Sequence, residues 1–299
     1  MKLATDHLSS LPSGRTTARH DGASKPVDGE PGAGRVNLSR VVGQTVVTRL
    51  WATSPLKLFV PRQRQRSAWI ITSNFGGGLV EGDHIDLTLH VGPGAIGYVG
   101  TQAATKVYRS EKNLGVTQVM RASIADQGLL VLAPDPVTCF AGAIYDQNQH
   151  FDLSGSGSLI LIDWITAGRV AHGERWSLDR YRCRNDIYLD GVHQYGDATV
   201  LDRTFGPIGA LFRTGPYNCL ATLVLVGDQV ESLARRFVDQ IDALPVRPRE
   251  SLIYSASTFE HGGVIRVAGV NTAEVAASLH DRLRHVADWL GEDPWARKC

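Results

Sequence analysis

The segment from Asn74 to Ser110 restricts the fold of this chain most strongly, because it combines a strand pattern with glycine-rich turns on both sides. Alternate positions of residues 84–91 are apolar, and they are Ile85, Leu87, Leu89 and Val91. A period of two residues is typical of a strand with one buried face. The glycines that bracket this stretch are Gly76, Gly77, Gly78, Gly92 and Gly94. We therefore predict a strand over 84–91 between two tight turns.

The pattern of short apolar runs continues from Ala68 to Asp202, with Gly, Pro, Asn and Asp between the runs and no helical period. Residues 129–133 and 159–165 are almost continuously apolar, which is typical of strands buried on both faces. Around Asp190-Gly191 the sequence predicts a hairpin with a type I′ turn. The expected fold class is mainly β, with short strands stacked in an irregular β-helix-like or multi-sheet architecture.

The C-terminal third adds two segments with helical spacing, near 228–244 and 272–290. Each has a capping pattern at its start, Asp228 with Glu231 and Asn271 with Glu274. Strands are expected between the helices and, near the N-terminus, over 41–51.

The N-terminal segment is different, because twelve of the 26 residues from Ser9 to Gly34 are Gly, Pro or Ser. Such a composition buries too little apolar surface to offset the entropy lost on ordering. We expect residues 1–35 to be disordered and dispensable, and residues 36–299 to form a single β-rich domain.

Charge and cysteine usage exclude several classes of protein. The 31 basic and 30 acidic residues give a net charge of +1, which does not favour binding to nucleic acid or to an anionic membrane. The apolar runs are too short to span a bilayer, and residues 1–10 have no signal-peptide core, so a cytoplasmic protein is expected. Cys139, Cys183, Cys219 and Cys299 have no C-x-x-C spacing, which favours reduced thiols, the first three buried.

No motif in the chain indicates catalysis. The run GGGLVEGD precedes a strand and differs from the phosphate-binding glycine motifs, which precede a helix. No G-x-S-x-G elbow and no H-E-x-x-H helix occurs, although a triad assembled only in space stays open at this point. A small-molecule oxidoreductase would need a cofactor fingerprint. We therefore expect no enzyme and no permanently bound cofactor.

The run GGGLVEGDHIDL followed by TQAATKVYRS resembles the motif of the urease accessory protein D family, called H in some bacteria. Residues 54–59 upstream and Asp163-Trp164, Gly168-Arg169 and Gly173-Glu174 downstream extend the resemblance to about residues 36–295. The family usually has Gly-Gly-Asp where this chain has Glu81-Gly82-Asp83. The motif positions of this chain are Gly76, Gly77, Gly78, Gly82, Thr101, Gln102, Thr105, Lys106, Tyr108, Arg109, Gly168 and Arg169.

The resemblance implies a urease maturation factor without catalytic activity. It implies a scaffold that binds urease accessory proteins F and G, the latter a GTPase, and delivers nickel to the urease apoprotein, with an internal passage proposed for the ion. Oxygen ligands release a transition metal more readily than clustered nitrogen and sulfur ligands do. The carboxylates in the best-matched motifs, Glu81, Asp83, Asp163 and Glu174, are therefore the candidates for a transient nickel route.

Two alternatives stay open on the sequence alone. For Asp83 and Asp163 a structural role is equally possible. Each would then cap a turn or be a buried aspartate with its hydrogen bonds made inside the protein. The chain could also be a β-solenoid that binds or cleaves carbohydrate, although such proteins typically carry an export signal and exposed aromatic rows. Only 7% of the residues here are aromatic.

Overall fold

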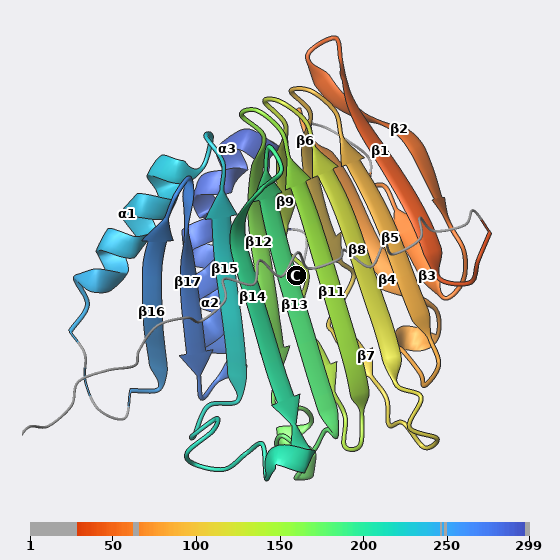
Figure 1. Ribbon diagram of the computed structural model, residues 1–299, viewed down its shortest axis with the longest axis vertical. Helices are drawn as coiled ribbons and strands as arrows, with labels where there is room; N and C mark the ends of the chain where they lie inside the picture. Colours follow the sequence, from red (N-terminus) through yellow and green to blue (C-terminus); the bar gives the residue numbers. More distant parts are fainter. Residues whose placement is uncertain (1–28, 62–65, 246, 248–249, 297–299) are drawn as a thin grey trace, which may run out of the picture.

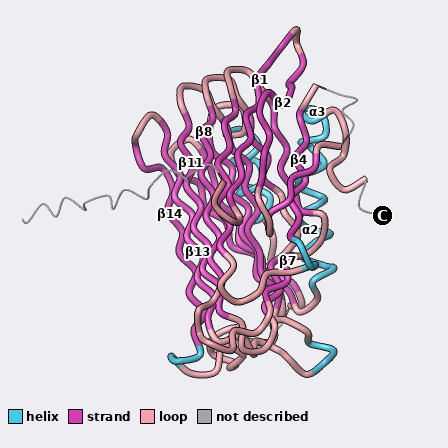
Figure 2. The backbone as a smooth tube through the Cα atoms, turned by 90° about the vertical axis from the view of Figure 1, so that its right-hand side faces the viewer, coloured by secondary structure: helices cyan, strands magenta, loops and turns pink. Residues whose placement is uncertain are grey.

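Two β-sheets stack face to face and helices cover the outer face of one of them, so the protein has three layers (Figures 1 and 2). In this computed structural model the described residues are 29–61, 66–245, 247 and 250–296. The seven-stranded sheet has the spatial order β14 (Val192–Asp202), β13 (Arg180–Leu189), β11 (Ile144–Leu153), β8 (Val116–Ile124), β5 (His84–Val91), β1 (Ala33–Val41) and β2 (Gln44–Ala52).

The ten-stranded sheet has the order β16 (Leu252–Phe259), β17 (Gly262–Gly269), β15 (Cys219–Val226), β12 (Ser158–Thr166), β9 (Leu129–Leu132), β6 (Ile96–Thr101), β4 (Ala68–Asn74) and β3 (Leu56–Phe59). Two short strands lie off this path: β10 (Val137–Cys139) pairs with β12, and β7 (Thr105–Val107) pairs with β10. The helices are α1 (Glu231–Asp242), α2 (Thr272–Leu283) and α3 (Ala287–Leu290), with 3-10 turns η1 (Phe75–Gly77), η2 (Val170–His172), η3 (Arg203–Phe205) and η4 (Arg284–Val286).

The chain builds both sheets by passing back and forth between them. Strands β5, β8, β11 and β13 pair in parallel in one sheet, and β4, β6, β9 and β12 pair in parallel in the other. Each coil of chain thus adds one strand to each sheet, as in an irregular solenoid. Antiparallel strands flank the parallel ones: β2 and β14 in one sheet, and in the other β3 on one side and β15, β17 and β16 on the other. The expected mainly β fold of stacked strands is confirmed.

Two apolar layers explain the continuous apolar runs. On β12, Leu159 and Leu161 face the core between the two sheets, whereas Ile160 and Ile162 belong to the core between the ten-stranded sheet and the helices. Because successive side chains of a strand point to opposite faces, the residues on both faces of β12 must be apolar. The seven-stranded sheet has no such second layer in Figure 1, and its strands alternate between buried and accessible residues.

Several local predictions are confirmed. Strand β5 spans the expected residues, and Asp190 and Gly191 form a hairpin turn with φ of 48° and 77°, as a type I′ turn requires. The side chain of Asn271 caps α2 by accepting a hydrogen bond from the Ala273 N–H. Cys139, Cys183 and Cys219 are buried free thiols, and burial raises the pKa of Cys139 to about 12. Cys299 lies outside the described residues.

Other local predictions are wrong. Helix α1 begins at Glu231 with Val230 as N-cap and no side-chain cap, so the capping box expected at Asp228 does not form. The segment 272–290 is not one helix, because a 3-10 turn separates α2 from α3. The strand expected over 41–51 is interrupted by a hairpin turn at Val42 and Gly43, both with positive φ. A β-branched residue is a poor turn signal at such a φ, which hid this turn in the sequence.

The ordered chain also begins earlier than Val36. Strand β1 starts at Ala33, which is only 2% exposed, and Ala33 pairs with Asp86 of β5. The Gly32 N–H donates to the Ser54 carbonyl at 2.9 Å. Pairing on both sides of β1 supplies the burial that this glycine-rich segment lacks by itself. Residues 1–28, the rest of the segment expected to be disordered, lie outside the described residues. Among the described residues, no helix is long and apolar enough to cross a membrane.

A truncation series tests this boundary. A chain that begins at Val36 loses the buried Ala33 and the first pairs of β1 with β2 and β5. Relative to a chain that begins at Gly29, we expect its free energy of unfolding to fall by about 2 kcal/mol or more and its Tm by about 5 °C. Thermal unfolding of both chains measures the difference. Equal Tm values would show that residues 29–35 are not docked.

Candidate functional site

The motif residues gather at one end of the sandwich, at the bottom of Figure 1. After η1, a single parallel bridge joins Leu79 to Val107 of β7, with hydrogen bonds from the Leu79 N–H to the Lys106 carbonyl and from the Tyr108 N–H to the Leu79 carbonyl. Gly78 makes this approach possible, since a Cβ there would lie 2.6 Å from the Tyr108 ring. The glycine run therefore serves close packing of two motif segments against each other.

Glu81 anchors the loop that follows this segment. Its carboxylate accepts hydrogen bonds from the Ser110 hydroxyl at 2.8 Å and from the backbone N–H groups of Glu111, Lys112 and Leu114 at 3.0, 2.7 and 3.0 Å. Four donors converge on one carboxylate, so its oxygens are committed to the loop. Glu81 is therefore a structural anchor for residues 110–114.

The ionisation of Glu81 makes this anchor sensitive to pH. Burial would raise the pKa of Glu81, but the hydrogen bonds from Leu114, Ser110, Lys112 and Glu111 outweigh it and hold the pKa below the ordinary 4.5. Because the folded pKa is lowered, the stabilisation is present above pH 4.5 and is lost as the pH falls through the folded pKa.

We therefore expect Glu81→Gln to loosen the loop at neutral pH in the way that acid loosens it in the unmodified chain. A neutral amide presents only one acceptor oxygen to four donors. Amide hydrogen exchange at residues 111–114 should be faster in the variant at pH 7, with the difference narrowing below pH 4.5. Exchange in β5, on the other side of the turn, serves as the internal control. Equal exchange of the loop at pH 7 would contradict the anchoring role.

Two further carboxylates of the predicted route also have local partners. Asp83 caps the turn before β5, because its Oδ2 accepts from the Val80 N–H at 2.8 Å. Glu174 forms an ion pair with Arg169, and it accepts from the Arg169 Nε at 2.9 Å and from the Ala141 N–H at 3.2 Å. These contacts fix the conformation of loops at the lower end of the sandwich.

An aromatic contact joins the two halves of the motif. The Arg169 guanidinium lies over the Phe140 ring at 4.3 Å, and the Tyr108 ring meets the same ring edge-on, with centroids 5.2 Å apart. A cation over an aromatic face and an edge-to-face ring pair are both attractive. Tyr108 and Arg169, about 60 positions apart in sequence, thus contact the same ring of Phe140.

Asp163 lies apart from these loops, inside the sandwich. It projects from β12 toward the seven-stranded sheet, on the strand face that also carries Leu159 and Leu161. Its carboxylate accepts from the Cys183 thiol at 2.7 Å and from Asn185 Nδ2 at 2.9 Å. Burial raises the pKa of Asp163, and these two hydrogen bonds oppose the rise.

Asp163 keeps some accessible surface because two cavities reach it. The main cavity, of about 390 Å³, runs between the sheets and is lined by apolar residues such as Leu87 and Met120, by Asp163, and at its rim by the exposed Gln102 and Lys106. The motif residues Thr101 and Thr105 also line it. Thr101 is fixed by Asp135, whose carboxylate accepts from the Thr101 hydroxyl at 2.9 Å.

The side cavity, of about 260 Å³, begins on the other side of Asp163. It follows a row of polar residues that pair directly across the ten-stranded sheet: Asp163 opposes Thr222, Thr222 opposes Arg266, and Arg266 opposes Ser255 of the edge strand β16. All four residues line the cavity. A line of polar groups thus leads from the Asp163 carboxylate to the sheet edge.

Comparison with known proteins identifies the family. A family model described as UreD urease accessory protein matches residues 30–298. The chain is 42% identical to the urease accessory protein UreD of Sorangium cellulosum (strain So ce56) over 271 residues, which cover 90% of this chain and 85% of the relative. It is 39% identical to the corresponding protein of Anaeromyxobacter sp. (strain Fw109-5) over 89% of both chains, and 31% identical to urease accessory protein D of Oryza sativa subsp. indica over 88% and 94%.

The chain belongs to the UreD urease accessory protein family. Membership supports a role in urease maturation. Of the four carboxylates predicted for a nickel route in this UreD family member, only Asp163 lines either cavity. Glu81 and Asp83 lie in one turn, and Glu174 is held by Arg169 in another loop. Among the described residues, no group of three or more His, Cys, Asp or Glu is placed to hold a metal ion.

Sequence reasoning missed the polar residues that hold Asp163. Gln147 and Gln149 on β11, and Cys183 and Asn185 on β13, all point into the sandwich. Gln149 Nε2 donates to Asn185 Oδ1 at 2.8 Å, and Gln147 Nε2 lies 3.4 Å from Asp163 Oδ1. The alternation of residues along β11 and β13 could have revealed them, because the neighbouring residues on the same face of each strand are apolar. A polar pair at core positions indicates a buried network.

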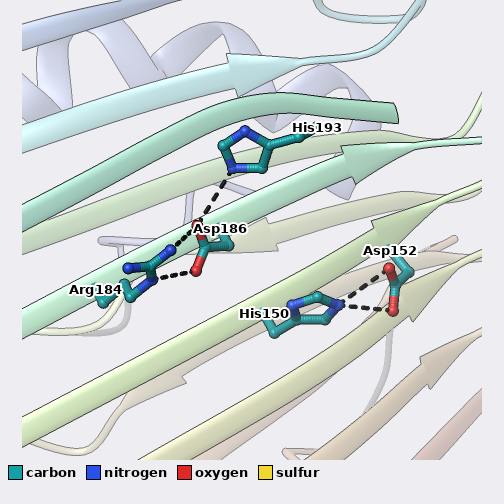
Figure 3. A network of polar contacts seen from close by, with 5 residues as sticks. All are labelled: His150, Asp152, Arg184, Asp186 and His193. Atoms are coloured by element: carbon teal, nitrogen blue, oxygen red, sulfur yellow. Dashed lines mark hydrogen bonds and ion pairs between the residues drawn. The ribbon is translucent and has the colours of Figure 1, made fainter. Parts of the chain in front are cut away.

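The outer face of the seven-stranded sheet carries a second group of titratable side chains (Figure 3). Asp186 accepts from Arg184 Nε at 2.5 Å and contacts His193 Nε2 at 3.2 Å, while His150 Nε2 contacts Asp152 at 3.1 Å. Each histidine thus has its own carboxylate on or next to its strand. These are separate polar contacts on the sheet surface, and contacts of this kind contribute little to stability.

Proposed function

We propose that this protein is a non-catalytic scaffold of urease maturation, which binds urease accessory proteins F and G and the urease apoprotein while nickel is delivered. Family membership over residues 30–298 supports the maturation role. The relatives are named as accessory proteins, which supports a role other than catalysis. The alternative of a carbohydrate-binding or carbohydrate-cleaving solenoid is not favoured by these relationships.

We further propose that nickel, as cargo, passes through the sandwich by way of Asp163. The observation that carries this proposal is that one carboxylate inside the sandwich borders both cavities. The route enters the main cavity beside Gln102 and Lys106, passes Asp163, and follows Thr222 and Arg266 toward the edge strand β16. Glu81, Asp83 and Glu174 line neither cavity, so in this proposal they shape the loops and do not contact the ion.

The chemistry of Asp163 suits transfer better than storage. A single carboxylate offers at most two oxygen ligands, whereas tight binding of Ni²⁺ needs several nitrogen or sulfur ligands around the ion. The Cys183 thiol donates its hydrogen bond to Asp163, and burial raises its pKa well above the usual range. The thiol is therefore protonated at neutral pH in the metal-free protein, and sulfur ligation would require the ion to displace that proton.

A deletion strain tests the maturation role. A urease-producing cell that lacks this protein should make normal amounts of urease subunits that contain little nickel and have little activity. Nickel in the purified urease is measured by atomic absorption, and the deletion is complemented with the gene in trans as a control. A nickel-loaded, active urease in the deletion strain would refute the proposal.

A further inference from the structure

One arginine bridges the two sheets at the outer end of the side cavity. Arg266 projects from β17, and its Nη2 donates to Asp197 Oδ1 at 3.1 Å and to the Tyr195 hydroxyl at 3.4 Å, both on β14 of the opposite sheet. The Arg266 side chain is 47% exposed and that of Asp197 is 18% exposed. In Figure 1, β17 and the edge strand β16 lie to the left of β14, the last strand of the seven-stranded sheet. The bridge therefore stands where the side cavity meets solvent.

The guanidinium of Arg266 also stands on the proposed nickel route. Arg266 lines the side cavity and directly follows Thr222 in the row of residues that begins at Asp163. An arginine keeps its positive charge throughout the pH range in which proteins are folded. A divalent cation that moves along this row therefore meets a fixed positive charge. The carboxylate that neutralises this charge is that of Asp197.

Asp197 lies next to the residues that hold Asp163. On β14, Tyr195, Asp197 and Thr199 share the face that points into the sandwich, and Thr199 lines the side cavity. Asp197 is directly opposite Asn185 of β13, and Asn185 Nδ2 donates to Asp163 Oδ2 at 2.9 Å. Directly opposite residues on neighbouring antiparallel strands have Cβ atoms about 5 Å apart. The side cavity thus has one carboxylate at its inner end and a second near its mouth.

The two carboxylates influence each other through space. Burial is the main cause of the raised pKa of Asp163, and repulsion from the Asp197 carboxylate adds to it. Neighbouring carboxylates are a usual way to hold a divalent cation, because each supplies oxygen ligands and the cation removes their repulsion. With Arg266 seated on Asp197, the second carboxylate already has a positive charge that belongs to the protein itself.

A structural role alone explains the Arg266–Asp197 pair less well. An ion pair this exposed contributes little to stability. The sheets are already joined beside it, because the rings of Tyr195 and Phe259 stack with centroids 5.5 Å apart. Arg121, in contrast, pairs with an aspartate of the neighbouring strand in its own sheet. The position of Arg266 therefore matters more for the charge of the side cavity than for holding the sheets together.

We propose that Arg266 is a tethered competitor of the nickel ion. It occupies Asp197 and leaves Asp163 alone to meet the ion in the side cavity, so that the ion is released and not stored. The inference rests on the proposed nickel route and names the residue that keeps this route weak. Arg266 is a positioning residue in this role, because it acts on the ion through Asp197.

Isothermal titration of the purified chain with Ni²⁺ tests the proposal. Arg266→Gln frees Asp197 and should bind Ni²⁺ with a Kd at least roughly tenfold lower than that of the unmodified chain. Arg266→Lys keeps the positive charge and should bind as weakly as the unmodified chain. Asp197→Asn added to Arg266→Gln should restore the Kd of the unmodified chain, because the second carboxylate is lost again.

Arg121→Gln is the matched control. It frees Asp86 in the same way, but neither residue lines a cavity. We expect the Kd of this control to equal that of the unmodified chain, and the Tm of Arg266→Gln to change by no more than about 3 °C. An unchanged Kd with a lowered Tm in Arg266→Gln would show that the pair only ties the sheets together, and would overturn the proposal. Equal tightening by Arg121→Gln would overturn it as well.

Two further variants separate this inference from the nickel route itself. Asp163→Asn added to Arg266→Gln should abolish the tighter binding, and tight binding that persists would overturn the inference. At limiting nickel, urease activated with Arg266→Gln should contain less nickel than urease activated with Arg266→Lys, because the ion leaves a tighter site more slowly. Equal nickel contents would contradict the role of Arg266 on the route. Normal nickel content of urease activated with Asp163→Asn alone would instead remove the route, whatever the titrations give.

Discussion

Asp163→Asn is expected to give a folded protein that still binds its partners but no longer supports nickel loading of urease. At an effective dielectric constant of about 20, one unit charge at 4 Å from another contributes about 4 kcal/mol, and about 1.4 kcal/mol makes a tenfold difference. We therefore expect the rate of nickel transfer to fall at least tenfold. The measurement is the nickel content of urease activated with the variant, at limiting nickel.

The difference in stability between this variant and the unmodified chain depends on pH. Because the folded pKa of Asp163 is raised above the ordinary 3.8, its contribution to stability is full below pH 3.8 and is lost as the pH rises through the folded pKa. An asparagine carries no charge at any pH. We expect the Tm of Asp163→Asn at pH 7 to equal or exceed that of the unmodified chain, and the difference to narrow in acid.

Asp163→Ala is the matched comparison, because it removes the acceptor as well as the charge. Cys183, Asn185 and Gln147 would then lose their common partner, at a cost of about 1–3 kcal/mol. We expect a lower Tm for this variant only. Normal nickel content of urease with Asp163→Asn, together with intact assembly, would remove Asp163 from the nickel route.

Gly168→Ala is expected to destabilise the motif end of the sandwich by several kcal/mol, on the order of 3. Gly168 has φ of +93°, and a Cβ there would lie 2.8 Å from the carbonyl oxygens of both Cys139 and Glu174. Both obstacles are backbone atoms that cannot rotate away. The turn that carries the Arg169–Glu174 ion pair must therefore move, and the Tm should fall by roughly 6–12 °C.

Gly173→Ala is the control for this prediction. Gly173 also has a positive φ, +78°, but no atom lies within 4 Å of the position a Cβ would occupy. Only the backbone preference is lost there, at a cost of about 1 kcal/mol. Differential scanning calorimetry of both variants separates the two effects. Equal losses of Tm would show that the close approach at Gly168 is not what requires a glycine.

The sequence determined the features that depend on neighbouring residues. Alternation over 84–91 predicted β5 because a strand exposes its two faces in turn, and Asp190-Gly191 predicted the hairpin because few residue pairs accept positive φ twice. The runs at 129–133 and 159–165 predicted strands covered on both faces. The hairpin turn at Val42-Gly43 escaped prediction because its first residue is β-branched, so the turn depends on the pairing of β1 with β2.

Only the tertiary structure decided what each candidate carboxylate does. Glu81, Asp83, Asp163 and Glu174 resemble one another in sequence, yet Glu81 anchors a loop some 30 residues away while Asp163 meets Cys183 and Asn185 across the sandwich. The reason is that a local pattern gives the face on which a side chain lies but not the strand that faces it. In a solenoid that alternates between two sheets, that opposing strand belongs to another coil, so the partners of Asp163 follow from the stacking of coils.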